Sequence, residues 1–240
     1  MSKMTFQESV INSIKNLIYK NRLISISGKA GTGKSSLSLF LIGKFLTSNI
    51  PYEGSCVWIQ ASELFPKKRL NSIFSNDNTK LKYLTENIFI TPGNYPYSTF
   101  DIQVEALKNL SKNNYLLPPD IKFIVIDNIS HHLRFKFSQI NDINQRACLV
   151  NNFYDLVLNP LIFRCHREKI NLILIHEVSF RVEAQQTRPF FSKLYDRLKG
   201  VQITLSKSFI SNQRKIELNC TNTQRSYKFD LVENGFNFSK

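Results

Sequence analysis

The sequence predicts an α/β fold: a mostly parallel central sheet flanked by helices, with antiparallel strands at its C-terminal end. Three observations favour this fold. Short apolar runs alternate with helix-length stretches over residues 21–205, which is typical of parallel strands joined by crossover helices. A glycine-rich loop stands between the first of these runs and the helical pattern that follows it. After residue 205, strand-like runs are separated by polar turns, as in antiparallel hairpins.

The chain has the composition of an ordinary globular protein. Its 240 residues are 42% hydrophobic, 12% aromatic and 21% charged, without internal repeats or low-complexity linkers. The N-terminus has no signal-like apolar segment, and no run of about 18 apolar residues occurs. The 4 cysteines have neither metal-binding nor disulfide-framework spacing. We therefore expect an intracellular protein without a membrane partner, in the cytoplasm or, in a eukaryote, the nucleus.

The first expected element is an amphipathic helix. Thr5 and Glu8 form a capping-box pattern, and apolar residues recur at helical spacing as far as Ile18. We expect residues 1–20 to form an N-terminal helical segment and residues 21–240 to form the core.

Apolar runs predict the strands, and a helix that is apolar on most sides is expected to begin at Lys34. The turn signal Glu233-Asn234-Gly235 follows the last predicted strand. The predicted strands are 23–26, 56–59, 88–90, 123–126, 173–175, 201–205, 215–218 and 227–231.

The glycine-rich loop has the pattern G-x-x-x-x-G-K-[ST] between a predicted strand and a predicted helix, the setting that a phosphate-binding P-loop requires. Glycines allow the backbone angles that turn successive N–H groups toward phosphate oxygens at the positive end of the helix. Lys34 is predicted to reach the β- and γ-phosphates. The residues expected to bind ATP or a similar triphosphate are Gly28, Lys29, Ala30, Gly31, Thr32, Gly33, Lys34, Ser35 and Ser36.

Two oxygen ligands are predicted for the Mg²⁺ ion that accompanies the triphosphate. The hydroxyl of Ser35 would complete the octahedral shell of the ion. Asp127 ends the apolar run 123–126 in the manner of a Walker B aspartate and would hold the ion through a water molecule. An aspartate at the end of a strand is common, so this assignment depends on the complete loop upstream.

Beyond the P-loop, four looser segments resemble the RecA/RadA recombinase superfamily, especially its short RadA-like members, the archaeal RadA paralogues and the eukaryotic recombinase paralogues. The resemblance implies a RecA-like core that binds ATP and Mg²⁺ and hydrolyses ATP weakly in a DNA-dependent reaction. It also implies a role in homologous recombination and DNA repair, with single-stranded DNA and other recombinase-family subunits as partners. The four segments are residues 58–70, 127–137, 173–178 and 188–205.

The chain departs from the family where catalysis is expected. In the family, the strand after the P-loop helix ends in a glutamate that activates the attacking water, and a gapless alignment places Ser62 there, with Glu63 one residue further. His176 and Glu177 replace the family's Asn-Gln sensor pair, and Glu177 is a second candidate for polarising water. The alternative is that this pair is satisfied by neighbouring backbone groups or a salt bridge. The catalytic candidates are Lys34, Glu63 and Glu177.

Two segments, 131–137 and 180–193, interleave cationic and aromatic side chains, the chemistry that holds single-stranded DNA by its phosphates and bases. The 32 Lys and Arg against 18 Asp and Glu give a net charge of +14, which favours a polyanionic partner, although a basic proteome or solubility would explain the same excess. Burial in the core or at a partner interface is an equal alternative for the phenylalanines. The predicted DNA contacts are Arg134, Phe135, Lys136, Arg181 and Arg188.

Other functions remain open. A nucleotide-binding scaffold subunit of a recombinase-paralogue complex, with little or no hydrolysis, would account for the displaced glutamate. A KaiC-like or DnaB/DnaC-like P-loop ATPase has the same order of strands and loops. The roughly 20 residues before the core are too few for the N-terminal domain and polymerisation linker of full recombinases, so autonomous filament assembly is not expected. A third basic run, Lys67-Lys68-Arg69, is expected at the solvated start of a helix.

Overall fold

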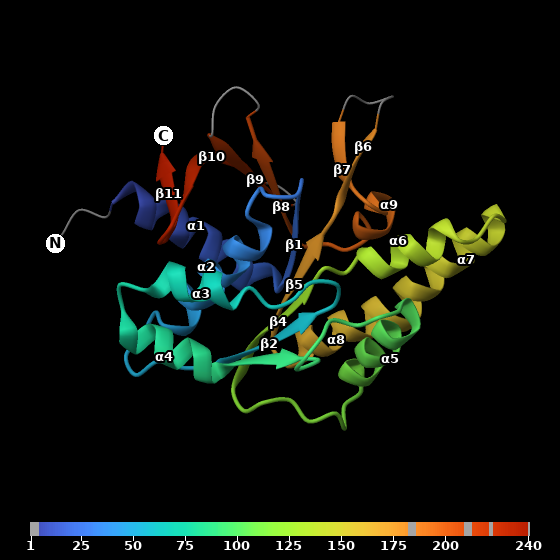
Figure 1. Ribbon diagram of the computed structural model, residues 1–240, viewed down its shortest axis with the longest axis horizontal. Coiled ribbons are helices and arrows are strands. Elements are labelled where there is room, and N and C mark those ends of the chain that lie inside the picture. Colours follow the sequence, from blue (N-terminus) through green and yellow to red (C-terminus); the bar gives the residue numbers. More distant parts are fainter. Residues whose placement is uncertain (1–4, 182–185, 209–212, 221–222, 240) are drawn as a thin grey trace.

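The computed structural model describes residues 5–181, 186–208, 213–220 and 223–239, and for Phe180, Arg181 and Gln186 it describes the backbone alone. A central sheet lies between two layers of helices (Figure 1). The helices are α1 (Phe6–Asn21), α2 (Lys34–Leu46), α3 (Lys67–Phe74), α4 (Asn78–Asn87), α5 (Phe100–Ser111), α6 (His131–Ser138), α7 (Ile143–Phe153), the π-helical turn η1 (Tyr154–Leu158), α8 (Asn159–Arg167) and α9 (Ser192–Tyr195). The strands are β1 (Leu23–Gly28), β2 (Ser55–Gln60), β3 (Ile88–Thr91), β4 (Ile121–Asp127), β5 (Asn171–His176), β6 (Val178–Arg181), β7 (Gln186–Pro189), β8 (Val201–Lys207), β9 (Arg214–Cys220), β10 (Thr223–Val232) and β11 (Gly235–Ser239).

Within the described ranges, nine strands form one sheet in the order β11-β10-β9-β8-β1-β5-β4-β2-β3, and β6 and β7 form a separate antiparallel hairpin. From β8 to β3, all neighbouring strands run parallel. The C-terminal strands β9, β10 and β11 then extend the β8 edge in antiparallel pairs. The sheet confirms the predicted fold class.

All of the predicted strands are present, and each is longer than the apolar run that predicted it. Three further strands were not predicted. The short strand β11 follows the tight turn at Gly235 and alternates apolar and polar residues over only five positions. Strands β6 and β7 are mostly polar or cationic, so hydrophobic periodicity does not reveal them.

One face of the sheet is covered by α1, α2, α3 and α4. The predicted capping box begins α1: the Glu8 N–H donates to the Thr5 hydroxyl at 3.2 Å, and the Thr5 N–H donates to the Glu8 carboxylate at 2.8 Å. Helix α1 buries its apolar stripe in the same core as α2. Alternate residues of the central strands, such as Ile24 and Ile26 on β1, turn to this side. This core therefore holds the P-loop strand and the P-loop helix together.

The opposite face is covered in part. Helices α5, α6 and α8 and the turn η1 pack over β2, β4 and β5 in a second core. Over β1, β8 and β9, the sheet instead turns a polar surface toward a cavity of about 700 Å³, which the β6–β7 hairpin and α9 border. The polar floor of the cavity consists of Ser25, Ser27, Gln202, Thr204, Glu217 and Asn219.

Candidate functional site

The P-loop joins β1 to α2, and its backbone fits a phosphate group. Gly33 is the N-cap of α2 and has a φ of 101°, in the left-handed region that favours glycine. Because Gly33 has no side chain to accept a hydrogen bond, the N–H groups of the first turn of α2 are available to an anion at the positive end of the helix. A Cβ at Gly33 would lie 3.3 Å from the Leu231 side chain of β10. The C-terminal strands therefore border the loop.

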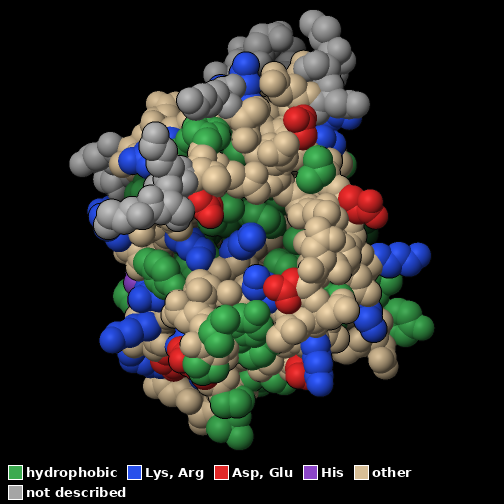
Figure 2. Space-filling view, turned by 90° about the vertical axis from the view of Figure 1, so that its left-hand side faces the viewer, with side chains coloured by type: hydrophobic (Ala, Val, Ile, Leu, Met, Phe, Trp, Pro, Cys, Tyr) green, Lys and Arg blue, Asp and Glu red, His purple; other side chains and the backbone are tan. Residues whose placement is uncertain are grey.

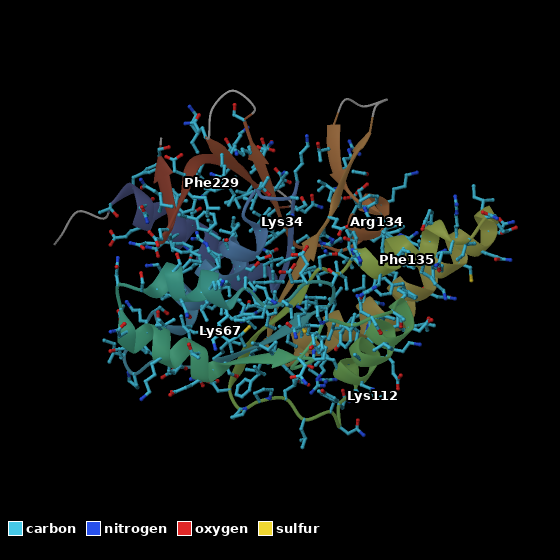
Figure 3. All side chains as sticks on the ribbon, in the orientation of Figure 1. Lys34, Lys67, Lys112, Arg134, Phe135 and Phe229 are labelled. Carbon is cyan, nitrogen blue, oxygen red and sulfur yellow. The ribbon has the colours of Figure 1, made fainter. Side chains whose placement is uncertain are left out.

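Lys34 folds back over the loop that precedes it. Its Nζ donates to the carbonyl oxygens of Gly28 at 2.9 Å and Lys29 at 3.2 Å. Burial lowers the pKa of the ammonium group, and the charges of Asp127, Glu63 and Glu177 oppose that shift. Figure 3 shows Lys34 near the centre of the molecule. A cation held at the P-loop by two backbone carbonyls is placed to neutralise phosphate charge.

Ser35 and Asp127 meet at the start of α2. The Ser35 hydroxyl donates to Asp127 Oδ2 at 2.7 Å, although the two residues are 92 positions apart. Burial raises the pKa of Asp127 to about 6, and the hydrogen bond from Ser35 opposes this shift. Ionising a buried carboxylate costs free energy, and a cation bound beside it would offset that cost. The environment of Asp127 therefore fits a cation site. The described residues contain no cluster of three or more His, Cys, Asp or Glu that would hold a metal ion alone. Ser35 would bind a Mg²⁺ ion directly and Asp127 would bind it through a water molecule, in a shell made mostly of phosphate and water.

Ser62 and Glu63 lie just beyond the end of β2. The Ser62 hydroxyl accepts from the N–H of Asn128 at 3.3 Å, and the peptide between Asp127 and Asn128 is cis. Ser62 is therefore bound to the end of β4. Glu63 is exposed, and its charge raises the pKa of both Lys34 and Asp127. Because its charge affects the P-loop lysine and Asp127, Glu63 remains a candidate for polarising water beside them.

Glu177 is held by three side chains at the end of β5. Its carboxylate accepts from Asn128 Nδ2 at 3.3 Å and lies 3.1 Å from His131 Nδ1. Arg134 Nη1 lies 3.3 Å from the other carboxylate oxygen. The Glu177 N–H donates to the Ser130 hydroxyl at 3.0 Å. The salt-bridge alternative for Glu177 is therefore present in the structure, although the oxygen that faces Arg134 has no hydrogen-bond partner among the described residues. A water-polarising role would require this network to open.

His176 is fully buried beside the cavity under the hairpin. Neither of its ring nitrogens has a hydrogen-bond partner among the described residues. Its ring packs edge-on against Tyr195 of α9 at 4.1 Å between centroids. Burial lowers its pKa to about 3, and the positive charge of Lys34 adds to that shift. His176 is therefore a neutral core residue, and it pairs in register with Ser27 of β1, the residue that precedes the P-loop.

The structure brings the two predicted DNA-contact segments together. The Arg134 guanidinium stacks over the Phe190 ring at 4.8 Å, and the rings of Phe137 and Phe191 lie 5.2 Å apart. Helix α6 thus packs against the segment that follows β7. Phe135 is 62% exposed and makes α6 an aromatic surface toward solvent, close to Arg134 in Figure 3.

The remaining predicted DNA contacts differ in their surroundings. Lys136 Nζ lies 3.5 Å from the Asp101 carboxylate of α5, so that part of its charge is compensated. Arg188 is exposed on β7 and borders the cavity under the hairpin. The side chain of Arg181 lies outside the described residues. Figure 2 shows another face, where Lys and Arg side chains are spread over the surface rather than gathered in one patch. The net charge alone therefore does not locate a polyanion site.

One residue of the site was not predicted. The basic run Lys67-Lys68-Arg69 was expected at the solvated start of a helix, and α3 does begin at Lys67, but Arg69 differs from the expectation. Lys67 and Lys68 are exposed, but Arg69 is half-buried, and its Nε donates to the Ser36 hydroxyl of the P-loop at 3.1 Å. Its partners lie 33 and about 160 positions away, so no local pattern reveals the contact.

The protein has the P-loop NTPase fold with a RecA-like core: a glycine-rich loop follows a central parallel strand, an aspartate ends another central strand, and antiparallel C-terminal strands extend the sheet.

The chain is similar to known proteins both in sequence and in structure. The chain is 27% identical over 168 residues to the DNA repair protein RAD57 of Saccharomyces cerevisiae, a match that covers 67% of this chain and 35% of the yeast protein. The chain thus spans about a third of the length of that relative. The crystal structure of the RadB recombinase matches with a TM-score of 0.66 and 18% identity over 91% of this chain and 90% of that chain. The chain is therefore similar in sequence to part of a DNA repair protein and similar in fold to a recombinase.

No protein-family model matches the chain. In the part of the chain that the structure describes, no helix is both long enough and apolar enough to cross a membrane.

Proposed function

We propose that the protein binds ATP with Mg²⁺ and binds single-stranded DNA, and that it acts as a RecA/RadA-type ATPase in homologous recombination and DNA repair. The observation that carries the proposal is the Glu177 network, because it joins the two candidate sites. Asn128, next to the metal candidate Asp127, and Arg134, on the candidate DNA surface, both contact the same carboxylate. The similarity to a DNA repair protein supports the proposal.

In the proposed nucleotide site, each residue has a distinct task. The P-loop N–H groups and Lys34 bind the phosphates, and Ser35 and Asp127 orient the metal, which supplies charge neutralisation when bound. Glu63 is the candidate that accepts a proton from the attacking water, because it is exposed, its charge raises the pKa of Lys34, and it forms no ion pair with any described residue. Glu177 is the second candidate, once its network opens.

ATP turnover with and without single-stranded DNA tests the enzymatic part. Lys34→Ala is expected to abolish nucleotide binding. Glu63→Gln is expected to lower kcat by a factor of about 10² or more while leaving the nucleotide affinity unchanged, because only the proton acceptor is lost. Glu177→Gln serves as the matched variant: a loss of turnover there and not at Glu63 would assign the base to Glu177. Wild-type turnover equal to that of Lys34→Ala would refute the hydrolytic part of the proposal.

Salt-titrated binding to single-stranded DNA tests the DNA part. Phe135→Ala is expected to weaken binding by an amount in the range of about 1–3 kcal/mol that one stacked base contributes. Phe163 on α8 is the matched control. It is 67% exposed, against 62% for Phe135, but it belongs neither to α6 nor to the segment that follows β7. Arg134→Ala is expected to reduce the salt dependence by about one phosphate contact. Equal effects of Phe135→Ala and Phe163→Ala would contradict the placement of DNA at α6.

A nucleotide-dependent scaffold subunit is the second candidate. Two observations favour it: Ser62 occupies the position of the family's catalytic glutamate and is bound to Asn128, and Glu177 is engaged by its own neighbours. In this case the partners would be other recombinase-family subunits. Stoichiometric ATP binding with turnover indistinguishable from Lys34→Ala is the result that would select this function.

A further inference from the structure

Arg69 joins two elements that are distant in the sequence. From α3, its Nε donates to the Ser36 hydroxyl at 3.1 Å, its Nη1 to the Glu233 carbonyl at 2.8 Å and its Nη2 to the Val232 carbonyl at 2.9 Å. The Ser72 hydroxyl, one turn along α3, donates to the same Glu233 carbonyl at 2.7 Å. The guanidinium therefore bridges the first turn of α2 and the turn between β10 and β11.

Close packing of α3 on α2 fixes this arrangement. A Cβ at Gly43 would lie 2.0 Å from the Phe74 ring, so the absence of a side chain lets the two helices approach. Gly43 lies two turns after Ser36, and Phe74 lies five residues after Arg69, so the helices run side by side with both pairs in contact. Figure 1 shows α3 beside α2.

The β10–β11 hairpin in turn supports the loop. Leu231 lies 3.3 Å from the position that a Cβ would take at Gly33, and Phe236 packs against Phe40 of α2 with ring centroids 5.4 Å apart. Arg69 binds the turn of this hairpin by hydrogen bonds, and Leu231 and Phe236 pack the apolar side of the hairpin against α2.

We propose that Arg69 is a positioning residue for the nucleotide: through its hydrogen bond to Ser36 and its bond to the β10–β11 turn, it orients the Ser36 hydroxyl toward the bound phosphates and holds Gly33 in place. The chemical basis is the direction of the Ser36 hydrogen bond. Arg69 carries only donors, so Ser36 Oγ accepts from it and its own proton is left to donate to a phosphate oxygen. This inference rests on the proposed nucleotide site and extends it to α3 and the C-terminal hairpin.

Affinity for a non-hydrolysable ATP analogue with Mg²⁺, measured with the thermal stability of the same full-chain samples, tests the inference. Arg69→Ala is expected to weaken binding by about tenfold, the value of one charged hydrogen bond. The double variant Arg69→Ala/Ser36→Ala is expected to bind no more weakly than Arg69→Ala, because the two residues act through one contact. Should Arg69→Ala not fold, Arg69→Lys carries the test, since it keeps the charge, lacks the planar fork, and is expected to bind severalfold more weakly than wild type.

Arg22 provides the matched control. Its Nη1 donates to the Lys169 carbonyl at 2.9 Å, beside the start of β1 and thus at the opposite end of that strand from the P-loop. Arg22→Ala is expected to leave the affinity unchanged even where it lowers the melting temperature. Wild-type affinity in folded Arg69→Ala, or additive losses for Arg69→Ala and Ser36→Ala, would overturn the positioning role alone. Absence of nucleotide binding by the wild type would instead refute the proposed function, and the positioning role with it.

Discussion

At the scale of single residues, burial determines the chemistry of the polar groups around the P-loop. Asp127 and His176 end neighbouring strands β4 and β5, and both are almost completely enclosed. Burial disfavours the charged form of each group, so it raises the pKa of the aspartate to about 6 and lowers that of the histidine to about 3. Asp127 has Ser35 as a partner, whereas the His176 ring is enclosed without a hydrogen bond among the described residues.

His176 should make the stability of the protein depend on pH. Its pKa is about 3 in the folded chain and 6.5 as the ordinary value, so below pH 6.5 the unfolded chain takes up a proton that the folded chain cannot. The free energy of unfolding should therefore fall as the pH decreases from 6.5, by up to about 1.4 kcal/mol per unit, and this contribution should be constant above 6.5. Urea denaturation of wild type and His176→Phe over this range measures the difference.

The exposed His166 of α8 supplies the control for that measurement. His166→Phe should keep the acid sensitivity of the wild type, whereas His176→Phe should lose most of it. Parallel pH profiles of wild type and His176→Phe would show that the enclosed ring does not contribute.

At the scale of elements, the helices are held to the sheet and to each other by a few contacts that tolerate little change. Gly43 in α2 admits the Phe74 ring of α3, as described above. On the opposite face, Arg164 of α8 is 4% exposed and donates to the carbonyls of Leu110 at 2.7 Å, Lys112 at 2.6 Å and Tyr115 at 2.8 Å. One side chain thus binds α8 to the end of α5 and the loop that follows it.

Gly43→Ala should destabilise the protein although alanine favours helix formation by about 1 kcal/mol. The new methyl group would overlap the Phe74 ring, so α3 must shift and its contacts to α2 are lost. Chemical denaturation is expected to show a net loss of about 1–3 kcal/mol. Gly93 has open space around it, so Gly93→Ala should have little effect. Recovery of stability in Gly43→Ala/Phe74→Leu would confirm the cause, and an unchanged midpoint for Gly43→Ala would contradict it.

Arg164→Met should cost about 3–5 kcal/mol, because it leaves buried carbonyl groups without their donor and removes one of the two arginines that bind Glu168. Arg167→Met, three residues along the same helix, is the comparison: the Arg167 side chain is 55% exposed, and its loss should change the free energy of unfolding by no more than about 0.5 kcal/mol. Nucleotide affinity should be unaltered in both variants, since α8 lies away from the P-loop. Equal denaturation midpoints for the two variants would rule out this role of Arg164.

At the scale of the whole molecule, the C-terminal strands complete the core that contains the P-loop helix. The Phe229 ring of β10 is completely buried and lies 5.1 Å from Phe236 and 6.1 Å from Phe238 of β11. Through Phe236, this aromatic group reaches Phe40 of α2. The antiparallel extension is therefore part of the same hydrophobic core as the nucleotide site, and Figure 3 shows Phe229 in this part of the molecule, far from Phe135.

Phe229→Ala should reduce the stability of the protein, whereas Phe135→Ala should reduce its DNA binding. Phe229→Ala removes a buried ring and should reduce the free energy of unfolding by about 3–5 kcal/mol. Phe135→Ala changes an exposed position and should alter stability by no more than about 0.5 kcal/mol, while it weakens DNA binding as proposed. Thermal denaturation of both variants, with DNA binding measured on the same samples, checks the pair. Similar losses of stability would contradict the separation of core and surface aromatic residues.

Much of this architecture follows from local patterns in the sequence. The P-loop motif requires its glycines in a short strand-to-helix turn, and alternating apolar runs identify the strands of the sheet, since both depend on backbone geometry and periodicity within a few residues. The same patterns indicate Asp127 at the end of its strand. They miss β6 and β7, whose residues are held by pairing with each other rather than by an apolar face.

The contacts that join the sites were decided by the tertiary structure. Ser35 contacts Asp127 because β1 and β4 flank the same strand, β5, in the sheet. Arg134 contacts Glu177 because α6 follows β4 beside the end of β5. Arg69 contacts Glu233 because the C-terminal hairpin folds back on α2. Each contact joins residues dozens of positions apart, and which partner is reached depends on strand order and on the close packing of helices. A single sequence carries the periodicity of its elements but not the order in which they pack. The places of the glycine-rich loop and of Asp127 at the ends of their strands were therefore predictable, while the contacts between distant residues were not.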